Sequence, residues 1–585
     1  MNILIRCIIA YCLCLAILSP LHAQNQVQPE EHYLKEHSFD LSNSIVDTFT
    51  TSSLPIVIIS TYGKRISRIS RIKATMAIID NEVGKWNSIS DEATGYLGRI
   101  SIKIRGNSSS TWLKKQYRIE TQDSVGENLN VSLLGFPKEN DWILNAPYID
   151  KSFIRNVLTY HIASAMGNWA SNTSYVELVL NNEFNGLYIL MEKVKRDKNR
   201  IDIEEMTCQD SCGGALTGGY ILCIDRGKEG ILSTQPPSPG SKLNVFYLFE
   251  YPKIDDITEP QQNYISNFIF NFENTIAKPY SATYHEDYAQ IIDIDSFVDY
   301  FIINELSKNV DGYRLSTYFY KDRDSKGGKL HMGPVWDFNL SYGLANYYDG
   351  LSTSGWELHY MLESPNALDD GNQVPFWWRR LLVDPEFTER IVERWFSLRN
   401  SVISIPHLHA FIDKTANMLK DPAKRNFSIW SPPGRSSKGF WPVPDTFYTF
   451  STYQNEVDFL KDWLSKRIAW MDENMNSLVT TAVHEDESFI PRFTMSVAWP
   501  NPFNPARQQV SIKCTLPGAG ELSVSIINIQ GQIIDKQHTF ERSQSTVTFH
   551  WDGRDALNRQ VPSGIYFLIF QCGQQKRVTK VSLLR

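Results

Sequence analysis

Short apolar or alternating runs, typical of half-buried β-strands, fill the first third of the chain. They cover residues 54–60, 71–80, 97–105, 114–120, 175–181 and 186–193. Between the fourth and fifth runs, residues 152–167 repeat apolar positions at helical spacing and predict a helix. We therefore expect a β-rich lobe that carries one helix.

Helical spacing dominates the middle of the chain. It runs through residues 259–276, 291–306, 376–387, 390–398 and 412–478, the last interrupted at 427–443. These segments predict an α-rich lobe. The polar and acidic stretch that follows, residues 481–493, is typical of a linker.

The pattern changes again after the linker. Six short alternating strands occupy residues 509–583, separated by turns such as Pro517-Gly-Ala-Gly520 and Asp552-Gly-Arg-Asp555. Regular strand spacing with turn residues between the strands predicts a small β-sandwich of roughly 90 residues.

One segment in the middle of the chain combines a helix, a turn and two strands. After the helix, Lys308–Gly312 forms a turn, and strands are expected at 316–321 and 329–336. Asp311 lies on the turn, and Asp337 directly follows the second strand. A hairpin between the strands would bring both carboxylates to one end of the structure, facing a shared cleft.

Two carboxylates in this arrangement suit phosphoryl transfer. One can hold Mg²⁺ against the phosphates, and the other can accept the proton of the attacking hydroxyl. The alternative is that Asp311 and Asp337 only cap turns, as Asp residues often do.

The segment contains Asn304-Glu-Leu, Asn309-x-Asp311, Tyr318-Phe-Tyr-Lys321 and Gly333-Pro-Val-Trp-Asp-Phe338. This set resembles the core signature of the CotH kinase family, an atypical protein-kinase-like fold. The resemblance implies that Asp311 is the catalytic-loop acid. It implies that Asp337 is the metal-binding acid, with Asn339 nearby, and that ATP and Mg²⁺ are cofactors.

A Gly/Ser turn, Arg105-Gly-Asn-Ser-Ser-Ser110, is followed by Lys114 and Lys115. Backbone N–H groups and hydroxyls of such a turn can approach phosphate, and an ammonium can reach it, although most such turns are only hairpin ends. CotH proteins show a similar turn followed by Lys-Lys, which implies Arg105, Ser108 and Lys115 as phosphate-side residues. Lys114 is the other choice, because strand alternation lets only one of the two lysines face the cleft.

Asp150 stands at the expected N-cap of the helix 152–167, and Arg155 lies one turn in. CotH proteins carry a similar Asp-x-x-x-x-Arg-Asn, which implies that both residues belong to the nucleotide side. Asp150 would then replace the helix Glu that pairs with the strand Lys in typical kinases. Glu192, at the end of the strand leading to the hinge between lobes, is a further nucleotide-site candidate, with an ordinary salt bridge as the alternative.

Composition and charge narrow the classes of function. Hydrophobic residues make up 42% of the chain and aromatic residues 12%, as in folded proteins. A chain of 585 residues is too long for one core. The net charge of −7 gives no reason to expect a nucleic-acid partner.

The first residues predict export. Arg6, the apolar run 7–18 and the small-residue site ending at Ala23 form a secretory signal peptide, Met1–Ala23. No other segment is long and apolar enough to suggest a transmembrane span.

The end of the chain contains Trp499-Pro-Asn-Pro-Phe-Asn-Pro505, Trp551-Asp-Gly553 and Ser563-Gly-Ile-Tyr-Phe567 before a short basic terminus. These residues resemble a type IX secretion sorting domain of type A. The resemblance implies the type IX secretion machinery as a partner and a secreted or cell-surface location. A permanently retained interaction module is the alternative.

The expected fold is α+β: an atypical protein-kinase-like bilobal domain followed by a small C-terminal immunoglobulin-like β-sandwich. The expected parts are a signal peptide (1–23), a polar lead-in (24–53), a CotH kinase-like domain (54–480), a linker (481–493) and the sandwich (494–585). Within the kinase-like domain, the β-rich N-lobe spans about 54–195 and the α-rich C-lobe about 250–480.

The leading hypothesis is a secreted CotH-like protein kinase that transfers phosphate from ATP to Ser or Thr of exported or cell-surface proteins. One alternative is a kinase-like surface-binding or adhesion protein with little or no transfer activity, since a fold does not guarantee chemistry. A third hypothesis, a polysaccharide-degrading enzyme, requires two acids at the spacing of glycoside hydrolysis.

Overall fold

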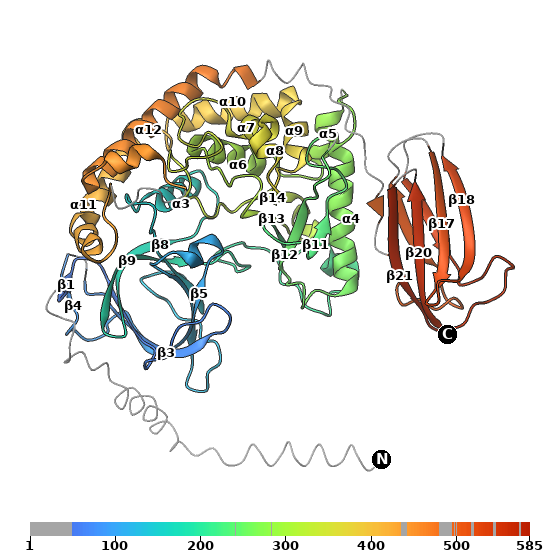
Figure 1. Ribbon diagram of the computed structural model, residues 1–585, viewed down its shortest axis with the longest axis horizontal. Helices are drawn as coiled ribbons and strands as arrows, with labels where there is room; N and C mark the ends of the chain where they lie inside the picture. The colour runs from blue at the N-terminus through green and yellow to red at the C-terminus, as the bar shows by residue number, and fades with distance from the viewer. Residues whose placement is uncertain are drawn as a thin grey trace, which may run out of the picture. The chain divides into compact units, whose positions relative to one another are not determined.

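The computed structural model describes most of the chain beyond residue 48 (Figure 1). The described residues are 49–82, 84–239, 241–281, 283–434, 442–478, 494–495, 498, 500–515, 520–541, 546–572 and 575–585. The predicted signal peptide, the linker and most of the lead-in lie outside them.

The chain divides into two compact units, which we describe separately. Unit 1 comprises the described residues up to Ala146 together with Thr173–Lys193 and Asp421–Trp430. Unit 2 comprises Pro147–Asn172, Val194–Lys420 and Ser431–Arg585.

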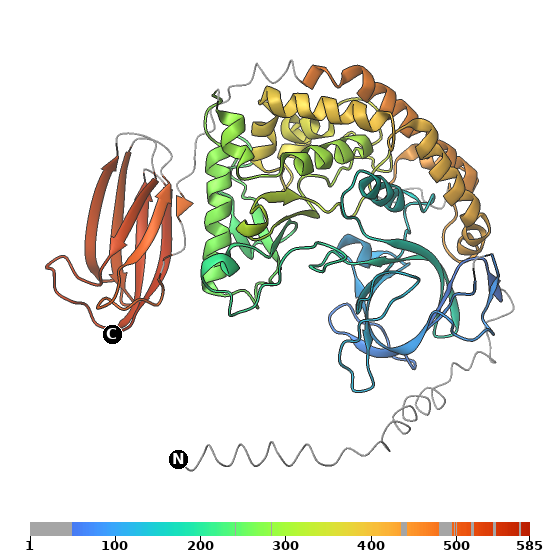
Figure 2. The same ribbon diagram turned by 180° about the vertical axis from the view of Figure 1, so that it is seen from behind.

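Unit 1 is a closed β-barrel of strand order β2-β3-β5-β6-β7-β9-β8 (Figures 1 and 2). Its strands are β2 (Ile56–Ser60), β3 (Ile72–Ile79), β5 (Tyr96–Arg105), β6 (Gln116–Gln122), β7 (Asp141–Asn145), β8 (Thr173–Leu180) and β9 (Glu183–Glu192). Neighbouring strands pair antiparallel, except that β2 and β8 pair in parallel and close the barrel. A short pair, β1 (Thr51–Ser52) with β4 (Asn87–Ser88), and the 3₁₀ turn η1 (Ser108–Thr111) complete the unit.

Strand alternation builds the barrel core. Ile100 and Ile102 of β5 point inward and are fully buried, as the predicted alternation requires. They pack in one cluster with Val57 and Ile59 of β2 and with Trp142 of β7. The strands predicted for this part of the chain are therefore confirmed.

Unit 2 contains a five-stranded sheet of order β11-β12-β10-β13-β14. The strands are β10 (Tyr220–Ile224), β11 (Gly230–Leu232), β12 (Phe246–Tyr251), β13 (Thr317–Lys321) and β14 (Leu330–Met332). Short 3₁₀ turns lie at η2 (Gly213–Thr217), η3 (Asp324–Lys326) and η5 (Asp445–Thr449).

The last strand of this sheet is shorter than the sequence pattern predicts. The predicted strand 329–336 ends in the structure at Met332. Gly333 has a φ of 105°, and Pro334 has no N–H to donate, so the strand ladder stops there. Asp337 consequently lies on a loop beyond the strand rather than at its mouth.

Most other elements of unit 2 before the C-terminal strands are helices. They are α3 (Arg155–Ala165), α4 (Glu259–Ile276), α5 (Tyr284–Ala289), α6 (Ile294–Ser307), α7 (Glu357–Glu363), α8 (Pro365–Leu368), α9 (Phe376–Leu382), α10 (Pro385–Arg399), α11 (Ile405–Ile429, whose end belongs to unit 1) and α12 (Tyr453–Asn474). The central helix is α6, which contacts α3, α7, α10, α12 and β14 (Figure 1). From Phe297 to Ser307 every residue of α6 is buried, so this helix is a core element rather than a surface one.

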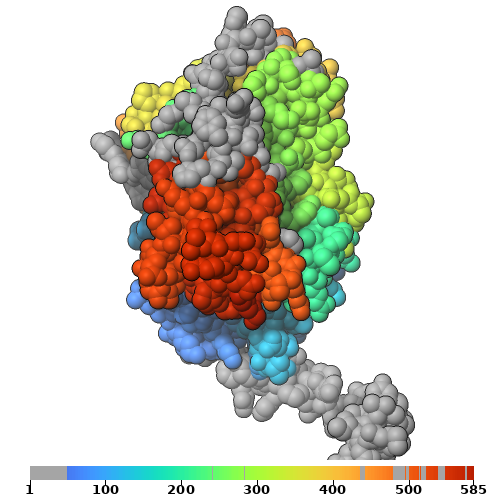
Figure 3. All heavy atoms as spheres, turned by 90° about the vertical axis from the view of Figure 1, so that its right-hand side faces the viewer, coloured from blue at the N-terminus to red at the C-terminus, as the bar shows by residue number. Residues whose placement is uncertain are grey.

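The C-terminal residues form a β-sandwich. Its three-stranded sheet has the order β15 (Thr494–Met495), β16 (Val510–Thr515) and β19 (Thr546–Trp551); its four-stranded sheet has the order β18 (Ile533–Glu541), β17 (Gly520–Asn528), β20 (Gly564–Cys572) and β21 (Gln575–Leu583). Trp551 packs between Phe503 and Tyr566, with ring centroids 5.6 and 5.1 Å away. The strands, orange to red in Figure 3, form one close-packed body. The predicted sandwich is confirmed.

Across the described ranges, none of the helices combines the length and apolar character that a membrane crossing requires.

Candidate functional site

The first site loop begins where α6 ends. Lys308 has a φ of 44°, a left-handed conformation that terminates the helix. The chain then turns through Asn309–Leu315. A Cβ at Gly312 would lie 2.4 Å from Oδ1 of Asn304 and 2.9 Å from the carbonyl oxygen of Asn309, so only glycine fits here. Asn304 and Gly312 therefore shape the loop that carries Asp311.

Asp311 is held through its side chain, which is 21% exposed. Its Oδ1 accepts hydrogen bonds from Nη2 of Arg314 (3.3 Å) and from the hydroxyl of Tyr347 (3.4 Å). Burial raises the pKa of Asp311, and the positive charges of Arg314 and Arg226 oppose this rise. A carboxylate with a raised pKa is a stronger base, which suits a group that accepts a proton.

Arg314 is fixed by contacts of its own. Its Nη1 lies 3.0 Å from Oδ2 of Asp370, and its Nε and Nη2 donate to the carbonyl oxygen of Val310 (3.2 and 3.0 Å). The guanidinium also lies 4.7 Å from the ring centroid of Tyr348. These contacts hold the guanidinium of Arg314, the partner of Asp311, in one position.

Asp337 is held differently, through the backbone of its loop. It has a φ of 64°, a left-handed conformation that Asp adopts more readily than most residues. Its backbone N–H donates to the hydroxyl of Tyr160 (3.3 Å), and the N–H of Phe338 donates to Oδ1 of Asn156 (2.6 Å). Asp337 itself is exposed and Asn339 is half-buried.

Asp150, which precedes α3, and Arg155, the first residue of that helix, support the same loop. Asp150 accepts from the backbone N–H of Arg155 (3.0 Å), and its Oδ1 lies 2.5 Å from Nη1 of Arg155. Nε of Arg155 donates to the carbonyl oxygen of Ser341 (3.0 Å) and Nη2 to that of Tyr342 (3.4 Å). The Arg155 side chain is fully buried. The structure thus places Asp150 and Arg155 beneath the loop that follows Asp337.

The two acid loops meet at the C-terminal end of α6. The backbone N–H of Tyr342, five residues after Asp337, donates to the carbonyl oxygen of Ser307, the last residue of α6 (2.7 Å). Asp311 lies four residues after Ser307 in the chain. Both loops therefore begin or end at one helix terminus.

In unit 1, Lys115 lies at the Gly/Ser turn and Lys114 does not. The ammonium of Lys115 donates to the carbonyl oxygens of Ser110 (2.9 Å) and Trp112. Ser110 lies in η1 and Trp112 directly follows it. Ser108, the first residue of η1, is exposed. Lys114 is 1% exposed and donates to Oδ1 of Asn426 (2.7 Å) and to the carbonyl oxygen of Leu187. The two lysines therefore differ in burial, which the alternation pattern did not predict.

The other unit 1 candidates lie on barrel strands. Nη1 of Arg105, the last residue of β5, donates to Oε1 of Gln116 (3.3 Å). Glu192, the last residue of β9, is fully buried and lies opposite Trp142 of β7.

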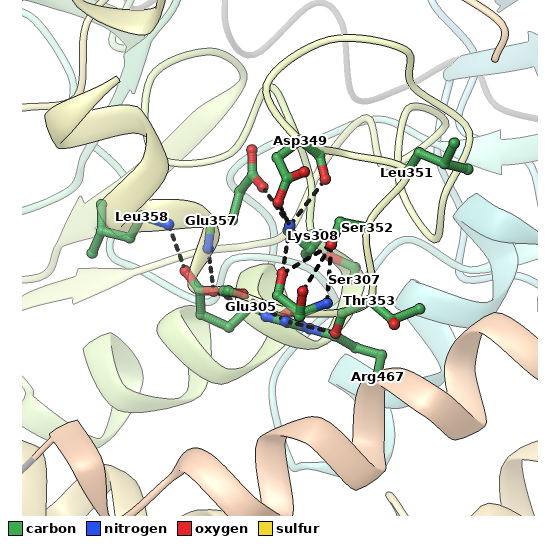
Figure 4. A network of polar contacts seen from close by, with 12 residues as sticks. Glu305, Ser307, Lys308, Asp349, Leu351, Ser352, Thr353, Glu357, Leu358 and Arg467 are labelled. Atoms are coloured by element: carbon green, nitrogen blue, oxygen red, sulfur yellow. Dashed lines mark hydrogen bonds and ion pairs between the residues drawn. The ribbon is translucent and has the colours of Figure 1, made fainter. Parts of the chain in front are cut away.

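A buried charge network adjoins the Asp311 loop and was missed by sequence reasoning (Figure 4). The carboxylate of Glu305 accepts from the backbone N–H groups of Glu357 (2.8 Å) and Leu358 (2.9 Å), which begin α7. It also accepts from the hydroxyl of Tyr313 (2.9 Å) and from Nη2 of Arg467 (3.2 Å). Glu305 thereby joins α6, α7, α12 and the Asp311 loop.

Lys308 completes the network on the other side of the loop. Its ammonium donates to the carbonyl oxygen (2.9 Å) and Oδ2 (2.8 Å) of Asp349 and to the carbonyl oxygen of Ser354 (2.9 Å). Asp311 thus lies between two anchored residues, Lys308 and Tyr313. Glu305 belongs to the quoted signature and Lys308 to the turn after it, whereas Arg467 is too distant in sequence to be paired with Glu305 by inspection.

The donor chemistry of the Asp337 loop fits Mg²⁺. No three His, Cys, Asp or Glu side chains within the described ranges gather closely enough to hold a metal ion. Protein sites for Mg²⁺ commonly provide only one or two carboxylates, with phosphates and water as the remaining ligands. Exposed Asp337 and nearby Asn339 offer the hard oxygen ligands that such a site uses.

A cavity of about 200 Å³ adjoins the segment that leads to Asp337. Gly333, Pro334 and Val335 line one side of it, and Tyr300 and Ile303 of α6 line another. Neither site acid lines this cavity.

Comparisons with known proteins match two separate parts of the chain. A family model described as CotH kinase protein matches residues 102–471, more than half of the chain, and a model described as FlgD Ig-like domain matches residues 503–569. The inner spore coat protein H of Bacillus subtilis (strain 168) is 20% identical over 366 residues, which cover 63% of this chain and 87% of that protein.

Two solved structures resemble short parts of the chain. PorZ of Porphyromonas gingivalis, titled a surface component of the type-IX secretion system, is 22% identical over 16% of this chain and 11% of its own, with a TM-score of 0.12. FlgD from P. aeruginosa is 18% identical over 16% of this chain and 69% of its own, also with a TM-score of 0.12. TM-scores this low do not establish a shared fold. The family match, which covers the signature segment and both acid loops, is the informative comparison, and by it the chain belongs to the CotH kinase protein family.

Proposed function

We propose that this chain is a CotH-like protein kinase that transfers phosphate from ATP to Ser or Thr hydroxyls of exported or cell-surface proteins. The observation that carries the proposal is the pair of acid loops at the end of α6. One loop presents an exposed acid on a fixed backbone, and the other holds a half-buried acid with a raised pKa. Membership of the CotH family supports the same chemistry.

Asp337 and Asn339 would hold Mg²⁺ in this proposal. When bound, Mg²⁺ supplies positive charge that neutralises the phosphates of ATP. The fixed backbone on either side of Asp337 keeps its carboxylate in one place, so that little rearrangement is required when the nucleotide arrives.

Asp311 would orient the acceptor hydroxyl and take its proton. The burial that raises its pKa strengthens it as a base, while the positive charge of Arg314 opposes this rise. Tyr347, on the same oxygen of Asp311, would fix the direction from which the hydroxyl approaches.

Asp150 and Arg155 would act through the Asp337 loop rather than on the nucleotide. Both are buried, and the donors of Arg155 reach Asp150 and two backbone carbonyl groups of that loop. They are therefore proposed as positioning residues. The residues of unit 1 that stay proposed for the nucleotide side are Arg105, Ser108, Lys115 and Glu192.

The export route is also proposed. The signal peptide Met1–Ala23 and the likeness of the C-terminal sequence to a sorting domain support secretion through the type IX machinery, with cell-surface proteins as substrates. Removing residues 494–585 should then leave the protein inside the cell envelope, as fractionation and immunoblotting would show.

The experiment on the kinase proposal compares the purified protein with Asp337→Asn. We expect the wild type to bind Mg²⁺-ATP and to incorporate labelled phosphate into surface proteins from its own host. Asp337→Asn should lose incorporation by roughly a hundredfold or more. Asp445→Asn, at an exposed acid outside both loops, is the matched control and should retain full activity.

The alternative surface-binding function predicts a different result. In that case neither the wild type nor Asp337→Asn would incorporate phosphate, and both would bind the same surface partners equally. This result would remove the kinase assignment and leave the family membership intact.

A further inference from the structure

Two histidines face each other between α3 and α11 in unit 2. Nε2 of His161, on α3, lies 3.4 Å from Nε2 of His407, in the first turn of α11. The ring centroids are 5.6 Å apart and the planes differ by 16°. The rings therefore meet edge to edge through these two nitrogens. His407 is exposed and His161 is half-buried, so ions in the solvent can reach the pair.

The surrounding packing fixes one of the two rings. His161 stacks on Phe411 with a centroid distance of 4.0 Å and an interplanar angle of 7°. Phe411 lies one helical turn beyond His407 on α11, so both contacts of the His161 ring come from the same helix. A ring held in this way loses little rotational freedom when it binds a ligand.

The separation of the nitrogens matches a shared metal ion. At Zn–N distances of about 2.0–2.1 Å, two nitrogen ligands of a tetrahedral zinc lie about 3.4 Å apart. Imidazole nitrogen also suits Cu²⁺ and Ni²⁺, and it is a poor ligand for Mg²⁺.

We propose that His161 and His407 form a two-histidine site for a divalent transition metal of the Zn²⁺, Cu²⁺ and Ni²⁺ class, with water as the remaining ligands. The site differs in ligand chemistry from the oxygen site proposed at Asp337 and does not depend on kinase activity.

Such an ion would join α3 to α11. His161 directly follows Tyr160, whose hydroxyl accepts from the backbone N–H of Asp337, and Asn156 lies further back on the same helix. A metal ion at the histidine pair would therefore stiffen the helix that supports the Asp337 loop.

The test uses the full chain without a polyhistidine tag, after treatment with a chelator. Calorimetric titration with ZnCl₂ in excess Mg²⁺ should show saturable binding at this pair. His161→Gln and His407→Gln should each weaken that binding by roughly tenfold or more, because each removes one of two protein ligands. His550→Gln, in the sandwich, is the matched control and should bind as the wild type does.

A second measurement counts the ligands directly. With one equivalent of Cu²⁺, the electron paramagnetic resonance spectrum of the wild type should show two imidazole nitrogens, and that of His407→Gln should show one. Because His407 is exposed, this variant is expected to fold normally, which the melting temperature without metal checks.

Three results would overturn the proposal. They are equal zinc affinity in the wild type and both pair variants, loss of binding in only one of the two variants, and a copper spectrum with a single imidazole nitrogen in the wild type. Each of these would indicate that the two rings only share a hydrogen bond.

Discussion

The two acid loops differ in how the protein holds them. The Asp311 loop is fixed by side chains: Arg314 and Tyr347 contact the acid, and Lys308 and Tyr313 anchor the chain on either side of it. The Asp337 loop is fixed through its backbone, and the acid itself is exposed.

The difference corresponds to two kinds of chemistry. A group that exchanges a proton needs a tuned pKa, and the pKa depends on the side chain's burial and its neighbouring charges. A group that binds a metal ion needs an accessible carboxylate at a fixed point, and a fixed backbone holds an exposed carboxylate in one place. Each variant below changes one of the two arrangements.

The largest effect is expected from Arg155→Met, which removes the support under the Asp337 loop. The change leaves the buried carboxylate of Asp150 without its positive partner. We expect the free energy of unfolding to fall by about 3–5 kcal/mol, measured by urea denaturation.

The control for this variant is an ion pair on the surface. Lys466 and Asp462 lie 2.7 Å apart on α12, with side chains 63% and 60% exposed. Lys466→Met should cost less than about 0.5 kcal/mol. Equal losses in the two variants would contradict a special role for Arg155.

The next effect concerns the left-handed backbone at Asp337. Asp337→Val places a β-branched residue at a φ of 64° and should lower the free energy of unfolding by about 1–3 kcal/mol. Asp337→Asn, which tolerates this conformation, should leave stability unchanged. Comparison of the two by urea denaturation separates backbone strain from loss of the carboxylate, and equal stability would indicate that the loop can relax.

Local pattern was enough to predict most elements of the fold. The predicted helix 259–276 coincides with α4, and the six strands predicted within residues 509–583 correspond to β16–β21. These elements follow from neighbouring residues alone, because periodicity records which side of a segment is buried.

Such patterns do not predict pairings between segments that are distant in the sequence. The barrel closes where β2 and β8 pair in parallel, for example at Val57 and Leu178. The sequence around either residue does not predict this pairing. The burial of Lys114 involves Asn426 of α11, more than three hundred residues away. The same holds for Arg467, which reaches Glu305 from α12.

The candidate acids were proposed from a resemblance, and the structure adds how each is held. The signature proposed candidate residues, but it did not predict that Asp150 and Arg155 would be buried beneath the Asp337 loop. Burial of this kind depends on the three-dimensional path of the loop, which the spacing of Asp150 and Arg155 does not encode.

A smaller effect is expected from Arg314→Gln, which alters the charge beside Asp311. Arg314 opposes the effect of burial, so its removal should raise the pKa of Asp311 further. The base would then be protonated up to a higher pH. The acidic limb of the profile of kcat/KM against pH should move upward by roughly one unit or more.

Arg390→Gln serves as the control, because Arg390 pairs with Asp295 on the surface and does not touch either loop. Its profile should match that of the wild type. An unchanged acidic limb in Arg314→Gln would indicate that another group limits the reaction at low pH.

The smallest effect is a gain in stability. Because burial raises the folded-state pKa of Asp311, its bound proton stabilises the fold below the unfolded-state pKa, and this contribution is lost as the pH rises through the folded-state pKa. Asp311→Asn cannot ionise, so at pH 8 it should be more stable than the wild type by on the order of 1 kcal/mol or less, and the advantage should vanish at pH 3. Urea denaturation at both values measures this, with Asp445→Asn as the pH-matched control. A variant less stable than the wild type at pH 8 would mean that attraction to Arg314 outweighs burial, and Asp311 would then be placed for charge pairing rather than for proton exchange.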